Sequence, residues 1–152
     1  MPKQSAGLLP YRRRGGVVEV LIAHPGGPYW ARKDDGAWSV VKGEYIDEEP
    51  LDAAKREFRE ETGLDVVGDP FLLNVITQKA GKVVTVFAVE ADYDAESAVS
   101  NTFEMEWPPR SGKMQSFPEV DRIEWFSLDD ARIKLLAAQS VLIDELVGRG
   151  LA

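Results

Sequence analysis

Residues 49–62 carry the clearest helical signal in the chain, together with a heavy load of acidic side chains. Apolar residues recur at spacings of three and four and form one buried stripe: Leu51, Ala54 and Phe58. Pro50 suits the first turn, and Gly63 is a natural stop. Three glutamates share the adjoining arc, where like charges oppose helix formation: Glu57, Glu60 and Glu61. Helix stability alone therefore does not explain why three glutamates lie next to one another.

The negative charge of the chain is concentrated around this helix. Residues 44–61 contain eight acidic and three basic side chains, a net −5 of the −8 carried by the whole chain. Carboxylates that converge on one patch are the oxygen donors that a hard divalent cation such as Mg²⁺ or Mn²⁺ prefers. The alternative that these residues leave open is an acidic face that is simply solvated.

The remaining sequence predicts an α/β fold. Short runs rich in branched or alternating apolar residues predict strands at 8–11, 17–23, 71–78, 83–91, 102–107 and 123–126, and a loop leads to a short segment at 38–41. The segment 79–82 predicts a hairpin turn, and Ser127 with Asp130 resembles a capping box that opens a helical tail to Leu136 and again over 140–147. We therefore expect helices on both sides of a central mixed β-sheet, in a single domain spanning residues 1–152.

Composition excludes several classes of site. The chain has no cysteine and one histidine, His24, which excludes zinc fingers, thiol nucleophiles and any site with two histidines. A net charge of −8 argues against a duplex-DNA-binding surface. No apolar stretch is long enough to span a membrane, and residues 1–7 lack a secretory pattern, so we expect a cytoplasmic protein with no membrane partner.

The segment from Gly43 to Leu64 strongly resembles the signature box of the Nudix hydrolases, G-x5-E-x7-R-E-U-x-E-E-x-G-U, where U is a bulky apolar residue. Gly43 is followed after four residues by Glu48, and after seven more by the run Arg56-Glu57-Phe58-Arg59-Glu60-Glu61-Thr62-Gly63-Leu64. Every fixed letter is present, and the one departure is a first loop that is one residue short. Taking Glu49 as the first glutamate would shorten the second spacing instead, but a helix that starts at Pro50 favours Glu48.

The resemblance implies a Nudix-type α/β/α sandwich that hydrolyses a nucleoside diphosphate linked to another moiety, such as a nucleoside triphosphate or a dinucleoside polyphosphate, with Mg²⁺ or Mn²⁺. By position in the box, the metal-binding set is Glu57, Glu60, Glu61 and Gly43 or the carbonyl of Lys42, and the catalytic set is Glu57, Arg56, Glu60 and Glu48. Arg56 is expected to orient the glutamates by pairing with Glu48. The base is either Glu57 or a carboxylate from a later loop, for which the candidates are Glu104, Glu106 and Glu119.

Substrate contacts are expected from cationic and aromatic side chains near the box. Lys42, Lys33 and Arg32 are candidate phosphate contacts, and Trp38, with Trp30 and Trp107, is a candidate for stacking on a base. His24 has no evident partner and is given no role. Two alternatives stay open: a Nudix-fold sensor that binds a nucleotide without cleaving it, and an acidic protein-interaction domain. A homodimer is also left open.

Overall fold

The computed structural model describes residues 3–151, so Met1, Pro2 and Ala152 of the predicted domain lie outside the description. A six-stranded sheet forms its centre, with β3 (Val41–Glu44) paired to β1 beside the main path. Along that path the strands follow the order β4 (Phe71–Thr77), β5 (Val83–Glu90), β1 (Gln4–Arg14), β2 (Val17–Pro25) and β8 (Val120–Ser127). The other five of these strands are predicted, with ends that differ by a few residues, whereas β3 is not predicted and meets the segment 38–41 only at Val41.

The sheet is mixed because β1 runs parallel to β5, whereas its other pairings are antiparallel. β1 is long enough to change partner along one edge. Its first half pairs with β3, where Ala6 lies opposite Gly43, and its second half pairs with β2, where Tyr11 lies opposite Val20. This change of partner leaves the space at the end of the sheet that the candidate site occupies.

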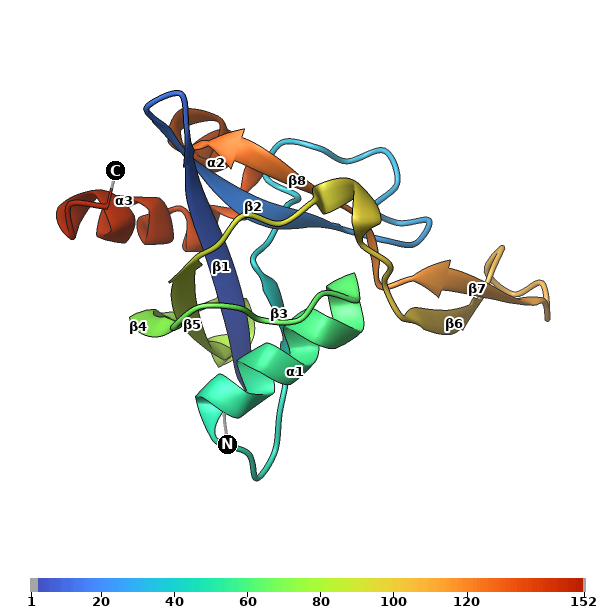
Figure 1. Ribbon diagram of the computed structural model, residues 1–152. Coiled ribbons are helices and arrows are strands. Elements are labelled where there is room, and N and C mark those ends of the chain that lie inside the picture. The colour runs from blue at the N-terminus through green and yellow to red at the C-terminus, as the bar shows by residue number, and fades with distance from the viewer. Residues whose placement is uncertain (1–2, 152) are drawn as a thin grey trace.

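Helices cover both faces of the sheet, as expected (Figure 1). α1 (Pro50–Thr62) packs Phe58 against Leu8 and Leu21 on one face. α2 (Leu128–Lys134) and α3 (Val141–Gly148) pack on the other face, where Leu142 and Ile143 belong to the same buried cluster as Leu9. Residues 8 and 9 thus face opposite helical layers, as neighbouring residues of a strand must. Over residues 3–151, no helix has both the length and the hydropathy needed to cross a membrane.

Local signals place the ends of these elements. Gly63 ends α1 in the left-handed conformation, with φ of 71°, and its N–H donates to the carbonyl of Arg59. The hydroxyl of Ser127 accepts from the N–H of Asp130 at the start of α2. Three short 3₁₀ turns complete the helical set: η1 (Lys79–Gly81), η2 (Ala95–Ser97) and η3 (Ala137–Gln139).

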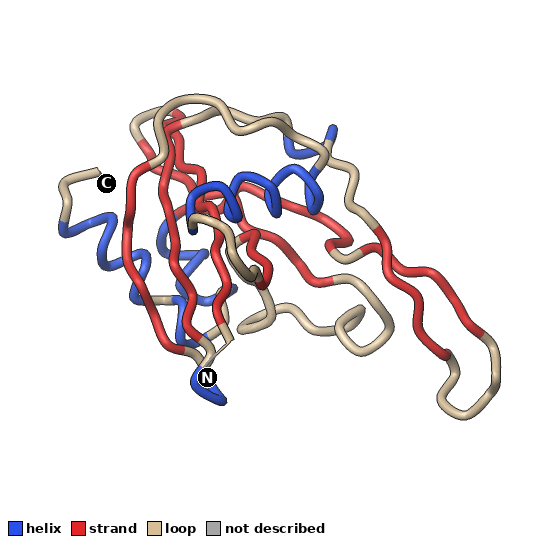
Figure 2. Tube along the Cα trace, turned by 90° about the horizontal axis from the view of Figure 1, so that it is seen from below, coloured by secondary structure: helices blue, strands red, loops and turns tan. Residues whose placement is uncertain are grey.

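A separate hairpin projects from the body (Figures 1 and 2). It consists of β6 (Thr102–Glu106) and β7 (Met114–Pro118), which pair only with each other. β6 is predicted correctly. The sequence pattern does not predict β7. Its residues are mostly exposed, so they lack the buried alternation by which a strand is recognised from sequence.

Candidate functional site

The predicted box residues meet where β3 lies against α1. Glu57 is buried, and its carboxylate fills the space above Gly43. A Cβ atom built on Gly43 would lie 2.1 Å from the carboxyl carbon of Glu57, which is far inside van der Waals contact. The glycine is therefore a steric requirement of this site, since any side chain at position 43 would displace the Glu57 carboxylate.

Arg56 holds three carboxylates at once. Its Nη2 donates to Glu48 at 2.7 Å, and its Nη1 donates to Glu57 at 2.9 Å and to Glu60 at 3.3 Å. The predicted pairing of Arg56 with Glu48 is confirmed as geometry. Hydrogen bonding from Arg56 lowers the pKa of the Glu48 carboxyl below its ordinary value. Arg56 thus fixes the loop before α1 to the acidic face of the helix.

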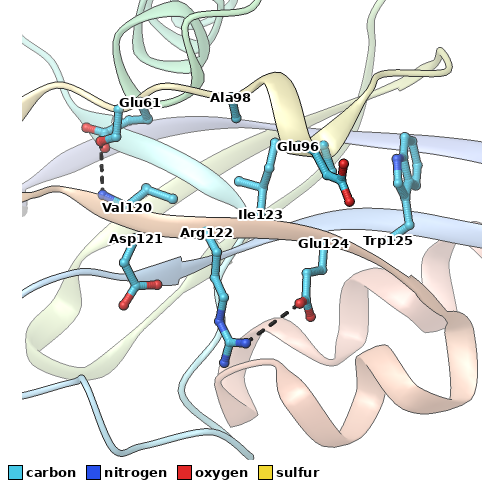
Figure 3. A pocket seen from close by; sticks show the side chains of 11 residues that line it. Glu61, Glu96, Ala98, Val120, Asp121, Arg122, Ile123, Glu124 and Trp125 are labelled. Atoms are coloured by element: carbon cyan, nitrogen blue, oxygen red, sulfur yellow. Dashed lines mark hydrogen bonds and ion pairs between the residues drawn. The ribbon is translucent and has the colours of Figure 1, made fainter.

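Glu61 lies on the other side of the acidic face and receives no such support. It reaches from the end of α1 toward Val120 at the start of β8 (Figure 3). In the part of the chain that the structure describes, no lysine or arginine forms an ion pair with Glu61. Burial raises the pKa of Glu61 to about 8, with the charges of Glu119, Glu57 and Glu60 adding to the shift. Burial likewise raises the pKa of Glu57, although Arg56 opposes the shift.

A cavity of about 240 Å³ opens beside Glu61, and we call it the carboxylate cavity. Its charged lining residues are Lys42, Glu61 and Glu119, and Trp30 forms part of its wall. Burial, with a smaller contribution from the neighbouring charge of Lys82, lowers the pKa of Lys42 to about 8. The cavity therefore combines a half-buried cation with acidic groups that lack counter-ions.

The three candidate late-loop carboxylates differ in position. Glu119 lines the carboxylate cavity and is close enough to raise the pKa of both Glu61 and Glu57. Glu106 accepts a hydrogen bond from the N–H of Arg110 and closes the tip of the hairpin. Glu104 is exposed on β6 and lies opposite Ser116. Only Glu119 of these three is brought to the box residues.

The prediction that Trp38 stacks on a base is wrong. Trp38 is 1% exposed and packs edge-on against His24 and Phe126, so its ring is part of the core and cannot stack on a ligand. Trp30, a neighbouring candidate, lines the cavity instead. Lys33 is exposed and places its ammonium 5.0 Å from the centre of the Trp30 ring.

His24 has a structural position that the sequence did not reveal. The ring is 1% exposed, its Nε2 donates to the carbonyl of Lys33 at 2.6 Å, and its Nδ1 lies 2.8 Å from the carboxylate of Asp121. Residues 33 and 121 are remote in sequence from each other. His24 therefore ties the loop after β2 to β8, next to the carboxylate cavity.

The donor set suits a hard divalent cation. Carboxylate oxygens gather around Glu61, which has no ion-pair partner among the described residues, and burial together with the charges of Glu119, Glu57 and Glu60 raises its pKa. Within residues 3–151, no three carboxylates already enclose a common point. One reason is that Glu57 and Glu60 both accept from Arg56. The residues thus match the cation in ligand type and charge.

Comparison with known proteins gives a family match over almost the whole chain. A model of the NUDIX domain matches residues 1–146. No curated protein sequence is significantly similar to the chain.

Among solved structures, a Caenorhabditis elegans Ap4A hydrolase in a binary complex is 19% identical, with 98% of each chain covered and a TM-score of 0.68. The NUDIX domain of Shewanella oneidensis NrtR complexed with ADP ribose is 16% identical, covering 98% of this chain and 88% of that one, with a TM-score of 0.67. A MutT/nudix family protein from Listeria innocua is 15% identical, covering 99% and 96%, with a TM-score of 0.63. At these identities the structures establish a shared fold.

Proposed function

The chain belongs to the Nudix family of hydrolases, which act on diphosphate bonds, and from this premise we propose that it is a Mg²⁺- or Mn²⁺-dependent enzyme cleaving a nucleoside diphosphate linked to another moiety. The observation that carries the proposal is Glu61, a half-buried carboxylate without an ion-pair partner among the described residues, facing Glu119 and Glu57. Such a group is costly to keep ionised unless a cation binds beside it. The cysteine-free composition is consistent with the cytoplasm as the proposed compartment.

We assign the binding of the cation to Glu57, Glu60 and Glu61, with the backbone at Gly43 beside them. When bound, the cation would neutralise the diphosphate and lower the pKa of a water molecule. Arg56 keeps Glu57 and Glu60 in place through its ion pairs, and Glu48 fixes the far side of its guanidinium. These positioning contacts hold the carboxylates within reach of the same substrate group.

Two carboxylates are candidates to remove a proton from the attacking water. Glu57 is buried and has a raised pKa. Glu119 lines the carboxylate cavity together with Glu61. A base whose pKa lies closer to neutrality accepts a proton more effectively at physiological pH. Lys42, at the wall of the same cavity, is placed to contact a phosphate oxygen, and Lys33 stands above Trp30 outside it.

The relatives suggest which substrates to test first. One structural relative is an Ap4A hydrolase, and another was solved with ADP ribose. Both compounds contain a nucleoside diphosphate linked to another group. We therefore propose a substrate of this type, without choosing between dinucleoside polyphosphates, ADP-sugar compounds and nucleoside triphosphates.

The test is a panel assay in which the purified protein is incubated with these compounds and Mg²⁺ or Mn²⁺, and the products are separated by chromatography. We expect cleavage of at least one compound at its diphosphate, abolished by excess EDTA and by Glu61→Gln. Turnover that persists in excess EDTA would contradict the metal assignment. Saturable nucleotide binding with no product from any compound would instead identify the protein as a sensor.

A further inference from the structure

A second cavity lies between the loop 25–30 and the projecting hairpin, and we call it the hairpin cavity. Its volume is about 390 Å³. The side chains that define it come from both elements: Pro28, Tyr29 and Trp30 from the loop, Phe103 and Met105 from β6, and Glu119 after β7. None of the box residues lines it.

Two glycines allow the loop to approach the hairpin closely enough to form this cavity. The N–H of Gly26 donates to the carbonyl of Glu119 at 2.9 Å, and a Cβ atom at Gly26 would lie 1.9 Å from the carbonyl oxygen of Pro118. Gly27 has φ of 97°, and a Cβ atom there would lie 3.0 Å from the ring of Phe103. The wall of the cavity is therefore built by close backbone packing.

An aromatic contact holds the outer part of the same loop. Tyr29 and Trp107 meet edge to face, with ring centres 5.2 Å apart, although Tyr29 is 58% exposed. This contact joins the loop to the hairpin beyond the end of β6. The cavity is thus bounded on both sides by aromatic residues that the fold holds in place.

The hairpin cavity adjoins the carboxylate cavity, and Pro25, Trp30 and Glu119 line both. The two differ in chemistry, because Lys42 lines the carboxylate cavity whereas no lysine, arginine or histidine of residues 3–151 lines the hairpin cavity. A phosphate group is favoured in the first, and a flat uncharged ring is favoured among the aromatic, methionine and proline side chains of the second.

We propose that the hairpin cavity binds the nucleobase of the substrate whose diphosphate occupies the carboxylate cavity. This rests on the proposed function for the identity of the substrate. The base packs among Trp30, Phe103 and Met105, so the loop 25–30 and the hairpin β6–β7 determine which nucleotides are accepted. Stacking on aromatic side chains contributes enough binding free energy to favour compounds that carry a base. It accepts different bases, because each base has a flat π-face.

The test uses the methionines as reporters, because the chain contains three and one of them lines the cavity. Met105 lies in the hairpin cavity, whereas Met114, on the partner strand, is 62% exposed and does not line it. In protein labelled with ¹³C at the methionine methyl groups, we expect AMP, GMP, CMP or UMP to shift the Met105 signal through the ring current of the base. The Met114 signal should stay in place. Met105→Ala and Met114→Ala each remove one signal and so assign the spectrum.

The control ligand is ribose 5-phosphate, which has the sugar and phosphate but no base, and it should leave Met105 unshifted. A Met105 signal that none of the four nucleotides moves, or that ribose 5-phosphate moves equally, would overturn the proposal. This experiment requires no hydrolysis, so its outcome is independent of the proposed activity.

Kinetics give a second measurement once a substrate has been identified. Met105→Ala should raise KM for that substrate by roughly two- to tenfold with little change in kcat. Met114→Ala should leave both constants unchanged. Equal effects of the two substitutions would show that the hairpin contributes only general stability, which contradicts a base-binding role.

Discussion

Arg56 and Glu61 lie on the same helix but in opposite electrostatic surroundings. Arg56 compensates Glu48, Glu57 and Glu60, and in doing so occupies oxygens that are candidate metal ligands. Glu61 is left among carboxylates, with a pKa raised to about 8, mainly by burial. The carboxylate that is unfavourable to ionise is therefore Glu61, which faces the carboxylate cavity. Its effect on the free energy of unfolding depends on pH.

Glu61→Gln should make the metal-free protein relatively more stable at high pH. The pKa of Glu61 rises from 4.5 to about 8 on folding, so the folded state holds the proton more tightly than the unfolded state. Its contribution to stability is present below about pH 4.5 and is lost as the pH rises through about 8. Urea denaturation of both proteins in EDTA at pH 5 and pH 8.5 measures the effect. The difference in free energy of unfolding, variant minus wild type, should be larger at pH 8.5, and a difference independent of pH would contradict the prediction.

His24→Leu should destabilise the protein by roughly 1–3 kcal/mol, because it removes the partner of the Lys33 carbonyl and of the Asp121 carboxylate at a buried position. Asp121→Asn keeps an acceptor facing Nδ1 and should cost less. Urea midpoints at constant m-value provide the measurement. If His24→Leu leaves the midpoint unchanged, the ring serves only as a packing group.

At the scale of elements, the sequence predicts those parts whose pattern is local. α1 is predicted almost to the residue because its stripe, proline and terminal glycine all agree, and the Arg56 pairing follows from position in the box. β7 could not be predicted because its residues are mostly exposed, and the hairpin cavity could not because it depends on Gly26 and Gly27 meeting Pro118 and Phe103 across a long sequence separation. Trp38 was misplaced for the same reason, since its burial depends on contacts with Phe126.

Gly43→Ala should lower turnover by about a hundredfold, the order expected when a catalytic group is misplaced by about 1 Å. The new methyl group would collide with the Glu57 carboxylate and separate β3 from α1 at the site. Gly148→Ala is the matched control, because nothing lies within 4 Å of its Cβ position at the end of α3, and its activity should equal wild type. Rates of both variants on the best substrate decide the matter. Similar rates for the two would mean that the approach of Gly43 to Glu57 is not needed for catalysis.

At the scale of the whole molecule, the candidate site joins parts of the chain that the sheet alone does not connect. Glu61 ends α1, Lys42 belongs to β3, and Glu119 leads into β8. A cation bound among the carboxylates would therefore link α1 to the start of β8, on the edge of β1 that lies opposite β5. Binding at such a position stabilises the entire fold rather than one element.

Mg²⁺ or Mn²⁺ should raise the melting temperature of the wild-type protein. The free energy of unfolding should increase by about 2.7 kcal/mol when the metal is present at about a hundred times its Kd. EDTA should reverse the shift, and Glu61→Gln should show a smaller one. Thermal melts with and without metal measure this, with K⁺ at equal ionic strength as the control for screening. An identical shift for K⁺ and Mg²⁺ would indicate general screening of the acidic face.

The position of β1 in the sheet also has a consequence for how the protein is made. β1 is the first strand in the chain, yet it lies in the middle of the sheet and pairs along its length with β5, residues 83–90. A chain emerging from the ribosome therefore carries β1 with one edge unpaired until β5 has been synthesised. Pairing at such sequence separation slows folding, and an open apolar strand edge is where nascent chains associate wrongly. The N-terminal strand is thus open to wrong pairing during translation for as long as β5 has not been synthesised.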